Sequence, residues 1–274
     1  MEKLKKWLTW IDINVLKLLV IGFIFIIPLY PKLPLKMINY TFIAIRVEDI
    51  YLVLVGLIFA IQFFRKKVTI PWKMFWLFVA YWVAVFGSFL YGHYVQNTIA
   101  IDHLGFLHSM RRIEYMLIFF VVFTTIKSKN DFFFYLKLIF SVLVIVSLYG
   151  FGQKFLGWPA VQTMNPEYAK GYFLVLDSWA RVSSTFAGHY DLAGYLILLM
   201  PIVIGFYLYS NHKRYMVLLT IALGVLVLTA SRASYIAFLA SIILYLVYVR
   251  KFKVLLFVLI TTALLTPLSD NLSN

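Results

Sequence analysis

Repeated apolar runs, separated by short polar connections, dominate the sequence. Runs of about 17–25 residues have the length that an α-helix needs to cross a hydrocarbon core about 30 Å thick. Backbone groups inside lipid must pair within the protein, so we expect helices and not open sheets. The pattern predicts an all-α, polytopic membrane helical bundle with nine spans: 13–30, 47–64, 70–91, 106–126, 132–156, 191–210, 215–230, 233–249 and 252–268.

Composition agrees with this prediction. Hydrophobic residues make up 63% of the 274 residues, more than one soluble core can bury. We find no internal repeat, low-complexity segment or flexible linker, so residues 1–274 are interpreted as a single transmembrane domain. The N-terminal apolar run ends at Pro28 without a small-residue cleavage site, which predicts an uncleaved first helix. The chain has no Cys, which excludes disulfides, thiolate metal sites and a Cys nucleophile.

Basic residues orient the predicted bundle. If the N-terminus is cytoplasmic, the inner connections carry Lys3, Lys5, Lys6, Arg65, Lys66, Lys67, Lys73, Lys127, Lys129, Lys213, Arg214, Arg250, Lys251 and Lys253. The outer connections are longer in total but carry fewer: Lys32, Lys36, Arg46, Arg111, Arg112, Lys154, Lys170, Arg181 and Arg232. The positive-inside rule therefore predicts a cytoplasmic N-terminus. Because these charges lie between apolar spans, the net charge of +14 does not indicate nucleic-acid binding.

This topology places three polar segments on the outer side of the membrane: 92–112, 157–190 and 230–232. Segment 157–190 is long for a connection, and long connections are often functional. Its aromatic residues favour the membrane interface, so we expect part of this extracytoplasmic loop to lie flat on the outer leaflet.

Arg232 lies in a short turn between two apolar spans. An Arg close to hydrocarbon is costly and is typical of an anion site or a functional pathway. The alternative is a side chain at a helix end that reaches out to a lipid phosphate.

Arg181 precedes the hydroxyl residues Ser183, Ser184 and Thr185. A planar guanidinium can bind a phosphate through two parallel hydrogen bonds, and hydroxyl groups can add donors. The alternative is a solvated Arg in a loop.

Arg111, Arg112 and Glu114 open the fourth predicted span. Arg111 and Glu114 are three residues apart, so we expect them to pair along one helix face. Arg112 is then left as a candidate substrate-binding residue.

His189 and Asp191 lie at the start of the sixth predicted span. His189 is a candidate acid–base group because His titrates near neutrality. We expect Asp191 to be the N-cap of the helix, which would by itself explain its presence. A metal site is the weaker interpretation of the polar residues in 92–112, because zinc needs three or four convergent ligands. Its candidates are His93, Asp102, His103 and His108.

Other catalytic signatures are absent. The sequence has no Gly-rich phosphate loop with Lys, no GxSxG and no HExxH, which leaves NTPase, serine-hydrolase and zincin activities without support. Charges within the predicted spans are few (Lys17 and Lys137), which argues against an ion-coupled transporter with a site in mid-membrane.

Two stretches together resemble the family of O-antigen ligases and polymerases, the membrane glycosyltransferases of bacterial surface polysaccharides. Residues 181–196 read RVSSTFAGHYDLAGYL, similar to that family's Arg, Thr-Phe and His-Pro-Asn-x-x-Ala-x-Tyr-Leu pattern at the start of a helix. Residues 228–234 read LTASRAS, similar to its Thr-x-Ser-Arg-Gly/Ala-Ser turn. The resemblance covers about 175–245, and Tyr190 and Asp191 depart from it where Pro-Asn is more frequent.

The resemblance implies glycosyl transfer on the outer side of the bacterial cytoplasmic (inner) membrane, in lipopolysaccharide or other polysaccharide biosynthesis. The donor would be a glycan on undecaprenyl diphosphate, and the acceptor a lipid A core, another glycan or a protein. Arg181 and Arg232 would neutralise the diphosphate leaving group, with Arg112, Ser184, His189, Asp191 and Ser231 as further substrate-binding candidates. Such a reaction needs no nucleotide and no obligatory metal.

Family members carry a catalytic His in a large outer loop beyond the helices present here. This predicts that residues 1–274 are the N-terminal part of a longer protein and are inactive alone. Ligation and polymerisation of the glycan both remain open. The alternative from another class is a non-enzymatic transporter or flippase for lipid-linked glycans, which would need charges along a path through the bilayer.

Overall fold

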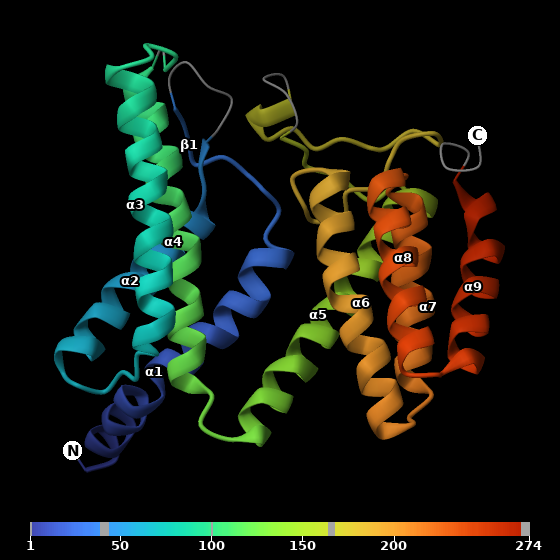
Figure 1. The fold of residues 1–274 in the computed structure, drawn as a ribbon, viewed down its shortest axis with the longest axis horizontal. Helices are drawn as coiled ribbons and strands as arrows, with labels where there is room; N and C mark the ends of the chain where they lie inside the picture. Colours follow the sequence, from blue (N-terminus) through green and yellow to red (C-terminus); the bar gives the residue numbers. More distant parts are fainter. Residues whose placement is uncertain (1, 39–43, 100, 164–167, 270–274) are drawn as a thin grey trace. The chain divides into compact units, whose positions relative to one another are not determined.

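The computed structural model is helical (Figure 1). It describes residues 2–38, 44–99, 101–163 and 168–269. The α-helices of this described part are α1 (Glu2–Leu29), α2 (Val47–Phe64), α3 (Trp72–Tyr94), α4 (Asp102–Thr125), α5 (Lys129–Phe155), α6 (His189–Ser210), α7 (Arg214–Leu228), α8 (Arg232–Tyr248) and α9 (Phe252–Leu265). Each predicted apolar run overlaps one of these helices, so the predicted all-α class is confirmed.

The remaining regular structure is short. Two strands, β1 (Lys36–Met37) and β2 (Ala44–Ile45), pair antiparallel in the connection between α1 and α2. Two single turns of 3-10 helix, η1 (Tyr168–Lys170) and η2 (Thr266–Leu268), complete the elements. In the connection between α5 and α6, the backbones of Ala160 and Leu174 exchange two hydrogen bonds of 2.7 and 2.9 Å. This connection is therefore partly fixed by its own backbone.

Five helices among the described residues are long and apolar enough to cross a membrane: α1, α2, α3, α5 and α6. Helix α3 shows most clearly a surface suited to lipid, because it has no buried residue. Its apolar side chains are accessible instead, with Trp76 63% and Leu77 64% exposed. An apolar surface of this extent is stable against lipid, whereas soluble monomers rarely expose one. The chain is therefore a membrane protein by the character of its helices.

The other four helices differ from these five. Helices α7, α8 and α9 have 15, 17 and 14 residues. At about 1.5 Å per residue they reach roughly 21–26 Å, less than a hydrocarbon core of about 30 Å. Helix α4 is long enough but carries Arg111, Arg112 and Glu114. For these four helices, membrane crossing stays a prediction.

The connection between α3 and α4 is shorter than predicted. Helix α3 ends at Tyr94 and α4 begins at Asp102, so most of segment 92–112 is helical. His103 and His108 lie on the first two turns of α4 and not in a loop. Polar residues at a helix start are compatible with helix formation, and an acidic residue there interacts favourably with the helix dipole. The apolar pattern alone placed the helix start too late.

The chain divides into two compact units. The first comprises Met1–Phe23 and Glu48–Tyr135. Within it, α3 and α4 pack together, and the ring of Phe78 lies 5.2 Å from that of Phe119 and 5.0 Å from that of Phe120, between centroids. The hydroxyl of Tyr51 donates to the carbonyl oxygen of Leu19 at 2.5 Å, which joins α2 to α1.

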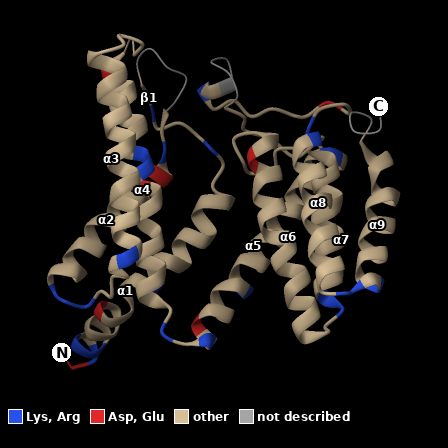
Figure 2. Ribbon diagram, viewed as in Figure 1, with Lys and Arg blue, Asp and Glu red and all other residues tan. Residues whose placement is uncertain are grey.

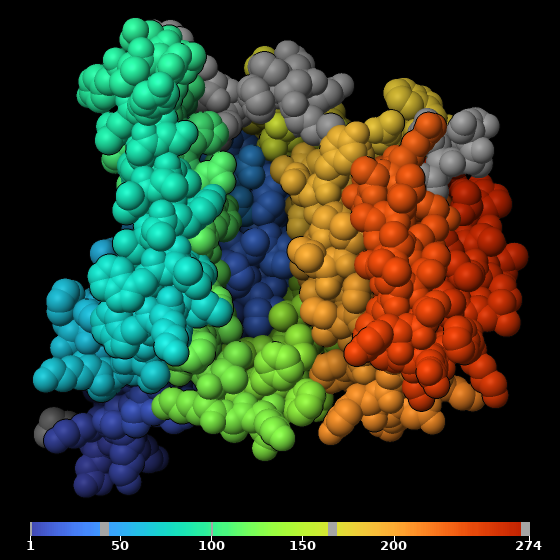
Figure 3. Space-filling view, in the orientation of Figure 1, coloured from blue at the N-terminus to red at the C-terminus, as the bar shows by residue number. Residues whose placement is uncertain are grey.

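The second unit comprises Ile24–Val47 and Leu136–Asn274. Helix α7 is its centre, because α6 and α9 both contact it and every residue from Ala222 to Leu228 is buried. Helix α8 contacts α6 and α9, and Figure 3 shows α6 and α8 side by side on the face turned to the viewer. Most of the buried apolar residues of this unit are Leu, Val, Ile and Ala, so apolar packing stabilises it.

Candidate functional site

The segment before α6 is fixed to α5 by a buried glutamine. Gln153 accepts a hydrogen bond from the backbone N–H of Ser184 (2.7 Å) and donates one to the carbonyl oxygen of Ser184 (2.9 Å). The Ser184 hydroxyl donates to the carbonyl oxygen of Val146 at 2.7 Å. Ser184 has a φ of 51°, a left-handed conformation that is unfavourable for Ser and needs such support. The path of the loop is therefore determined at Ser184.

Two of the three hydroxyl groups that follow Arg181 form hydrogen bonds within the fold. Ser184 donates to Val146 as described, and Thr185 donates to the carbonyl oxygen of Pro28. Ser183 is buried, and its Oγ has no hydrogen-bond partner among the described residues. In this arrangement the hydroxyls stabilise the loop beside Arg181.

A second polar segment forms the turn between α7 and α8. Thr229 donates to the carbonyl oxygen of Leu226 (2.6 Å) and accepts from the backbone N–H of Ser231 (3.3 Å). Ser231 is the N-cap residue of α8, and its hydroxyl donates to that of Ser234 at 2.9 Å. Arg232 follows as the first residue of α8 and is exposed. The turn therefore presents Arg232 at the end of a buried helix.

The structure brings these two segments together. The backbone N–H of Val182 donates to the carbonyl oxygen of Leu228 at 3.1 Å, although the residues are far apart in sequence. Both residues are buried, so this contact is inside the fold. Arg181 is exposed next to this contact, and Arg232 is exposed on the adjoining turn. In Figure 2, Lys and Arg colour marks this end of α7 and α8. Two guanidinium groups thus lie on adjoining segments at one end of the second unit.

Arg181 interacts with His189. Its Nη1 lies 3.1 Å from Nε2 of His189, the first residue of α6. A guanidinium can only donate, so Nε2 must accept, which requires a neutral imidazole with its proton on Nδ1. His189 is 5% exposed, whereas Arg181 is accessible. The buried imidazole therefore orients an exposed guanidinium.

The prediction that Asp191 is the N-cap of this helix is wrong. The N-cap is Gly188, in an extended conformation and without a side-chain capping bond, and Asp191 is exposed in the first turn. Helix α6 begins at His189, two residues before the predicted start at Asp191. A carboxylate in the first turn still interacts favourably with the helix dipole.

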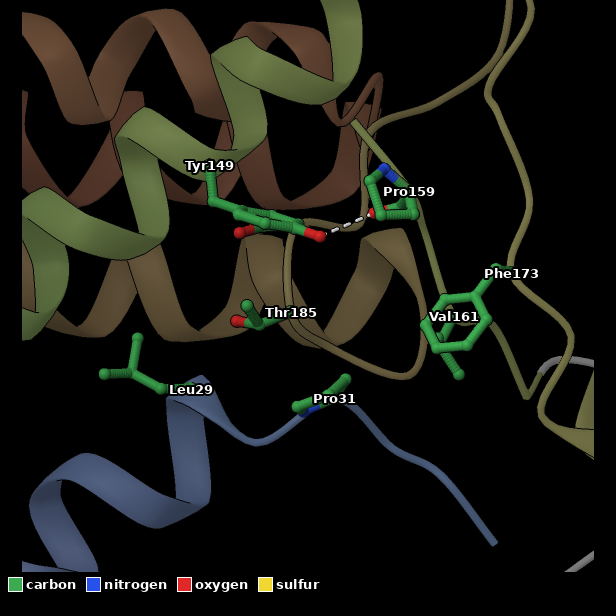
Figure 4. Close-up of a pocket in the computed structure, with 8 residues that line it drawn as sticks. Leu29, Pro31, Tyr149, Pro159, Val161, Phe173 and Thr185 are labelled. Carbon is green, nitrogen blue, oxygen red and sulfur yellow. Dashed lines mark hydrogen bonds between the residues drawn. The ribbon is translucent and has the colours of Figure 1, made fainter. Parts of the chain in front are cut away.

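A cavity of about 150 Å³ lies beside this loop. Figure 4 shows its walls, where the Tyr149 hydroxyl donates to the carbonyl oxygen of Pro159 at 2.8 Å. Leu29, Val161 and Phe173 contribute apolar surface. None of the described residues that line this cavity is Lys or Arg. Its lining therefore suits a small apolar group better than a phosphate.

Arg112, the remaining predicted substrate-binding residue, belongs to the first unit. It is exposed, and its Nη1 donates to the Tyr81 hydroxyl at 2.8 Å. The predicted pair of Arg111 with Glu114 is wrong, because Arg111 forms an ion pair with Asp49 of α2, with 2.8 Å between Nη2 and Oδ1. A contact between two helices takes the place of the expected contact along one helix.

The polar residues around the start of α4 do not assemble into a metal site. Nδ1 of His93 lies 3.1 Å from Oδ1 of Asp102. His103 and His108 are exposed on α4. Among the described residues, no group of three or more His, Cys, Asp or Glu side chains could hold a metal ion.

Sequence reasoning missed Gln153, the residue that fixes the Ser184 loop. A usable signal existed, because Gln153 is a polar residue near the end of a long apolar run, where it must find a partner. The identity of that partner depends on the fold.

Comparisons with known proteins do not identify a family. No family model, curated protein or solved structure matches this chain. A function for this chain is therefore inferred from its residues and their geometry, together with the resemblance of residues 181–196 and 228–234 to the O-antigen ligase family.

Proposed function

We propose that this chain is a membrane glycosyltransferase that uses a lipid diphosphate donor, similar to O-antigen ligases. The proposal is supported by one observation. The segments that carry the exposed Arg181 and Arg232 meet through the hydrogen bond between Val182 and Leu228. The two segments that meet there are the two that resemble the family.

The chemistry of the reaction explains the need for two cations. An acceptor hydroxyl oxygen forms a bond to the anomeric carbon of the donor sugar, and the bond between that carbon and the diphosphate oxygen breaks. The electron pair leaves with the diphosphate, and the hydroxyl proton passes to a base. Guanidinium groups bind phosphate oxygens through paired, charge-assisted hydrogen bonds. Positive charge placed where negative charge develops lowers the barrier, often by the largest single contribution.

The roles proposed for the other residues follow from their contacts. His189 positions Arg181, and its Nε2 is engaged by that contact. Ser231 lies at the start of α8, where backbone N–H groups also favour an anion. Ser184 shapes the loop, and Arg112 would contact the acceptor or the donor glycan.

We also propose that the chain crosses the bacterial inner membrane nine times with a cytoplasmic N-terminus. The support is the distribution of Lys and Arg among the connections, since every predicted inner connection carries at least two of them. With this topology Arg181 and Arg232 face outward, where lipid-linked glycans are assembled onto their acceptors.

Removal of either arginine's charge tests the proposal. In cells that make the polysaccharide, Arg181→Gln and Arg232→Gln are each expected to reduce glycan attachment by about 100-fold or more, because one electrostatic contact to a transition state is worth about 2.7–4 kcal/mol. The glycan on its acceptor is separated on a gel, and the amount of protein in the membrane is measured by immunoblot.

Lys253→Gln is the matched control, because Lys253 is an exposed residue at the start of α9 and the substitution removes the same charge. It should leave attachment unchanged. Full attachment by both arginine variants would show that the proposed function is wrong. The acceptor seen on the gel distinguishes a ligase from a polymerase, which would extend the glycan itself.

A further inference from the structure

The first unit contains a polar cavity that the proposed function does not use. It has a volume of about 180 Å³ and lies where α1, the end of α2, the end of α4 and the start of α5 meet. This volume equals roughly six water molecules at about 30 Å³ each, enough for a phosphate group with a short substituent. The polar residues that line it include Asp12, Lys17, Gln62, Lys67, Lys127 and Asp131.

Ion pairs fix most of the charges around the cavity. Asp12 accepts hydrogen bonds from Arg65, at 2.9 Å between Nη2 and Oδ2, and from Lys67. Asp131 accepts one from Lys17 at 2.8 Å. These pairs hold long basic side chains in place, which reduces the entropy that a ligand must remove from them.

Positive charge exceeds negative charge at this cavity. Lys127 lines it and forms no ion pair within the described part of the chain. Among the described residues at the cavity, the four cations Lys127, Lys17, Arg65 and Lys67 face the two carboxylates of Asp12 and Asp131. Lys66, after the end of α2, and Lys129, the first residue of α5, are also exposed and add to the positive potential. The cavity therefore favours an anion.

A buried glutamine adds a more specific requirement. Gln62 is 4% exposed, and its Nε2 donates to Oδ1 of Asp12 at 3.2 Å. Its Oε1 is buried and has no hydrogen-bond partner among the described residues. The neighbouring hydroxyls of Thr124 and Thr125 donate to backbone carbonyl oxygens and so do not fill this position. A buried acceptor without a partner is unfavourable, so a hydrogen-bond donor that reached this oxygen would be stabilised by it.

Exposed apolar side chains indicate that the ligand has an apolar part. Ile13 lines the cavity and is 69% exposed, and Leu18 on the same helix is 42% exposed. Trp10, one turn earlier, is 53% exposed, and Trp is enriched where a membrane meets water. A lipid bound here could place its acyl chains along α1.

We propose that this cavity binds a phosphate group that carries a hydroxyl donor, supplied by the headgroup of an anionic glycerophospholipid. The basic side chains receive the phosphate oxygens, and Oε1 of Gln62 accepts a hydrogen bond from the headgroup hydroxyl. Lys127 is the cation that the ligand itself neutralises. The site does not depend on the proposed glycosyl transfer.

The test measures thermal unfolding of the purified chain in detergent, titrated with phosphatidylglycerol. Binding to the folded state raises the unfolding midpoint with the logarithm of one plus the ratio of ligand concentration to Kd. We expect the midpoint to increase with phosphatidylglycerol and to stay unchanged with phosphatidylcholine. Lys127→Gln should raise the lipid concentration that gives the same midpoint increase roughly fivefold, the effect of one Lys near an anionic headgroup. Gln62→Met, which keeps the side-chain length, should also raise it by roughly fivefold.

Lys73→Gln is the matched control, because Lys73 is exposed at the start of α3 and does not line the cavity. It should titrate like the unaltered chain. If Gln62→Met does not fold, the exposed Lys127 decides the outcome alone. Equal titration by Lys127→Gln and the unaltered chain would overturn the proposal. An equal midpoint increase with glycerol 3-phosphate in place of the lipid would assign the site to a soluble phosphate ester and overturn the lipid assignment.

Discussion

Arg181 is oriented by an imidazole and not by a carboxylate. A carboxylate partner would neutralise the guanidinium and compete with an incoming phosphate. The neutral His189 instead accepts one N–H at 3.1 Å and leaves the full positive charge on Arg181. The remaining N–H groups of the guanidinium can still bind an anion. In the proposed function, this contact lets His189 position Arg181 without transferring a proton.

Substitution of His189 should therefore act through Arg181. His189→Leu removes the acceptor, and we expect transfer to fall about 10- to 100-fold, which corresponds to about 1.4–2.7 kcal/mol. His189→Gln supplies an amide oxygen at similar reach and should retain transfer within about threefold. The measurement is glycan attachment in membranes that contain equal amounts of each variant.

A double substitution separates positioning from acid–base chemistry. If His189 acts only through Arg181, adding His189→Leu to Arg181→Gln should cause no further loss, because the two effects are coupled. An additional loss of full size would mean that His189 acts independently. A His189→Gln variant as inactive as His189→Leu would contradict the positioning role.

The partners of individual side chains were the least predictable feature of this sequence. The sequence drew attention to Arg181 and His189 as separate candidates, eight residues apart in a loop and a helix. Their contact forms across the segment that separates them, in which Gly188 is the extended N-cap residue of α6. Arg111 was expected to pair within its own helix, but Asp49 on another helix forms the ion pair. Helical spacing predicts contacts on one helix and carries no information on its neighbours.

Among the elements, the loop before α6 is fixed to α5 by a single buried amide side chain. Gln153 on α5 makes two hydrogen bonds to the backbone of Ser184, and both residues are 1% exposed. Without that amide, a buried N–H and a buried C=O would lose their partners. The bond from the Ser184 hydroxyl to Val146 would then be left to hold Ser184 in its left-handed conformation.

Gln153→Leu should destabilise the chain by about 2–4 kcal/mol, the cost of leaving two buried backbone groups unsatisfied. Thermal unfolding in detergent measures the change. Gln96→Leu is the control, because Gln96 is exposed and its side-chain amide donates to the Tyr91 hydroxyl and not to a buried backbone group. Its effect should stay within about 0.5 kcal/mol. Equal midpoints for the two variants would show that Gln153 does not stabilise the loop.

The helices themselves were the most predictable elements. An apolar run in lipid has one way to pair its backbone, so hydropathy alone locates the helix. Its ends are less certain because polar residues can continue the same helix, as at the start of α4. The short ribbon of β1 and β2 has two residues a strand, too few for any alternating pattern to reveal it.

At the scale of the whole molecule, the prediction that a direct labelling experiment can check is orientation in the membrane. The chain contains no Cys, so a single introduced Cys can be labelled without background. With the proposed topology, Trp179→Cys should react with a membrane-impermeant maleimide in intact cells. Lys213→Cys, in the connection between α6 and α7, should react only after permeabilisation. Both native residues are exposed, so access to the reagent is limited only by the membrane.

The unaltered Cys-free chain is the control and should remain unlabelled. Reaction of Lys213→Cys in intact cells, with Trp179→Cys protected, would reverse the orientation and place Arg181 on the cytoplasmic side. A further variant, Arg232→Cys, should label like Trp179→Cys. Labelling of these two from opposite sides would favour a transport path through the bilayer over a transferase site on one face.

The burial of α7 also affects how fast its backbone amides exchange with water. From Ala222 to Ser231, every residue is buried, and this stretch ends at the turn that carries Arg232. Amide protons exchange with water only when their hydrogen bonds open, and opening is rarest where packing is complete on all sides. The α7 amides should therefore be among the last in the chain to take up deuterium. The guanidinium of Arg232 can then change its own conformation in nanoseconds, while the backbone that carries it stays in place for far longer.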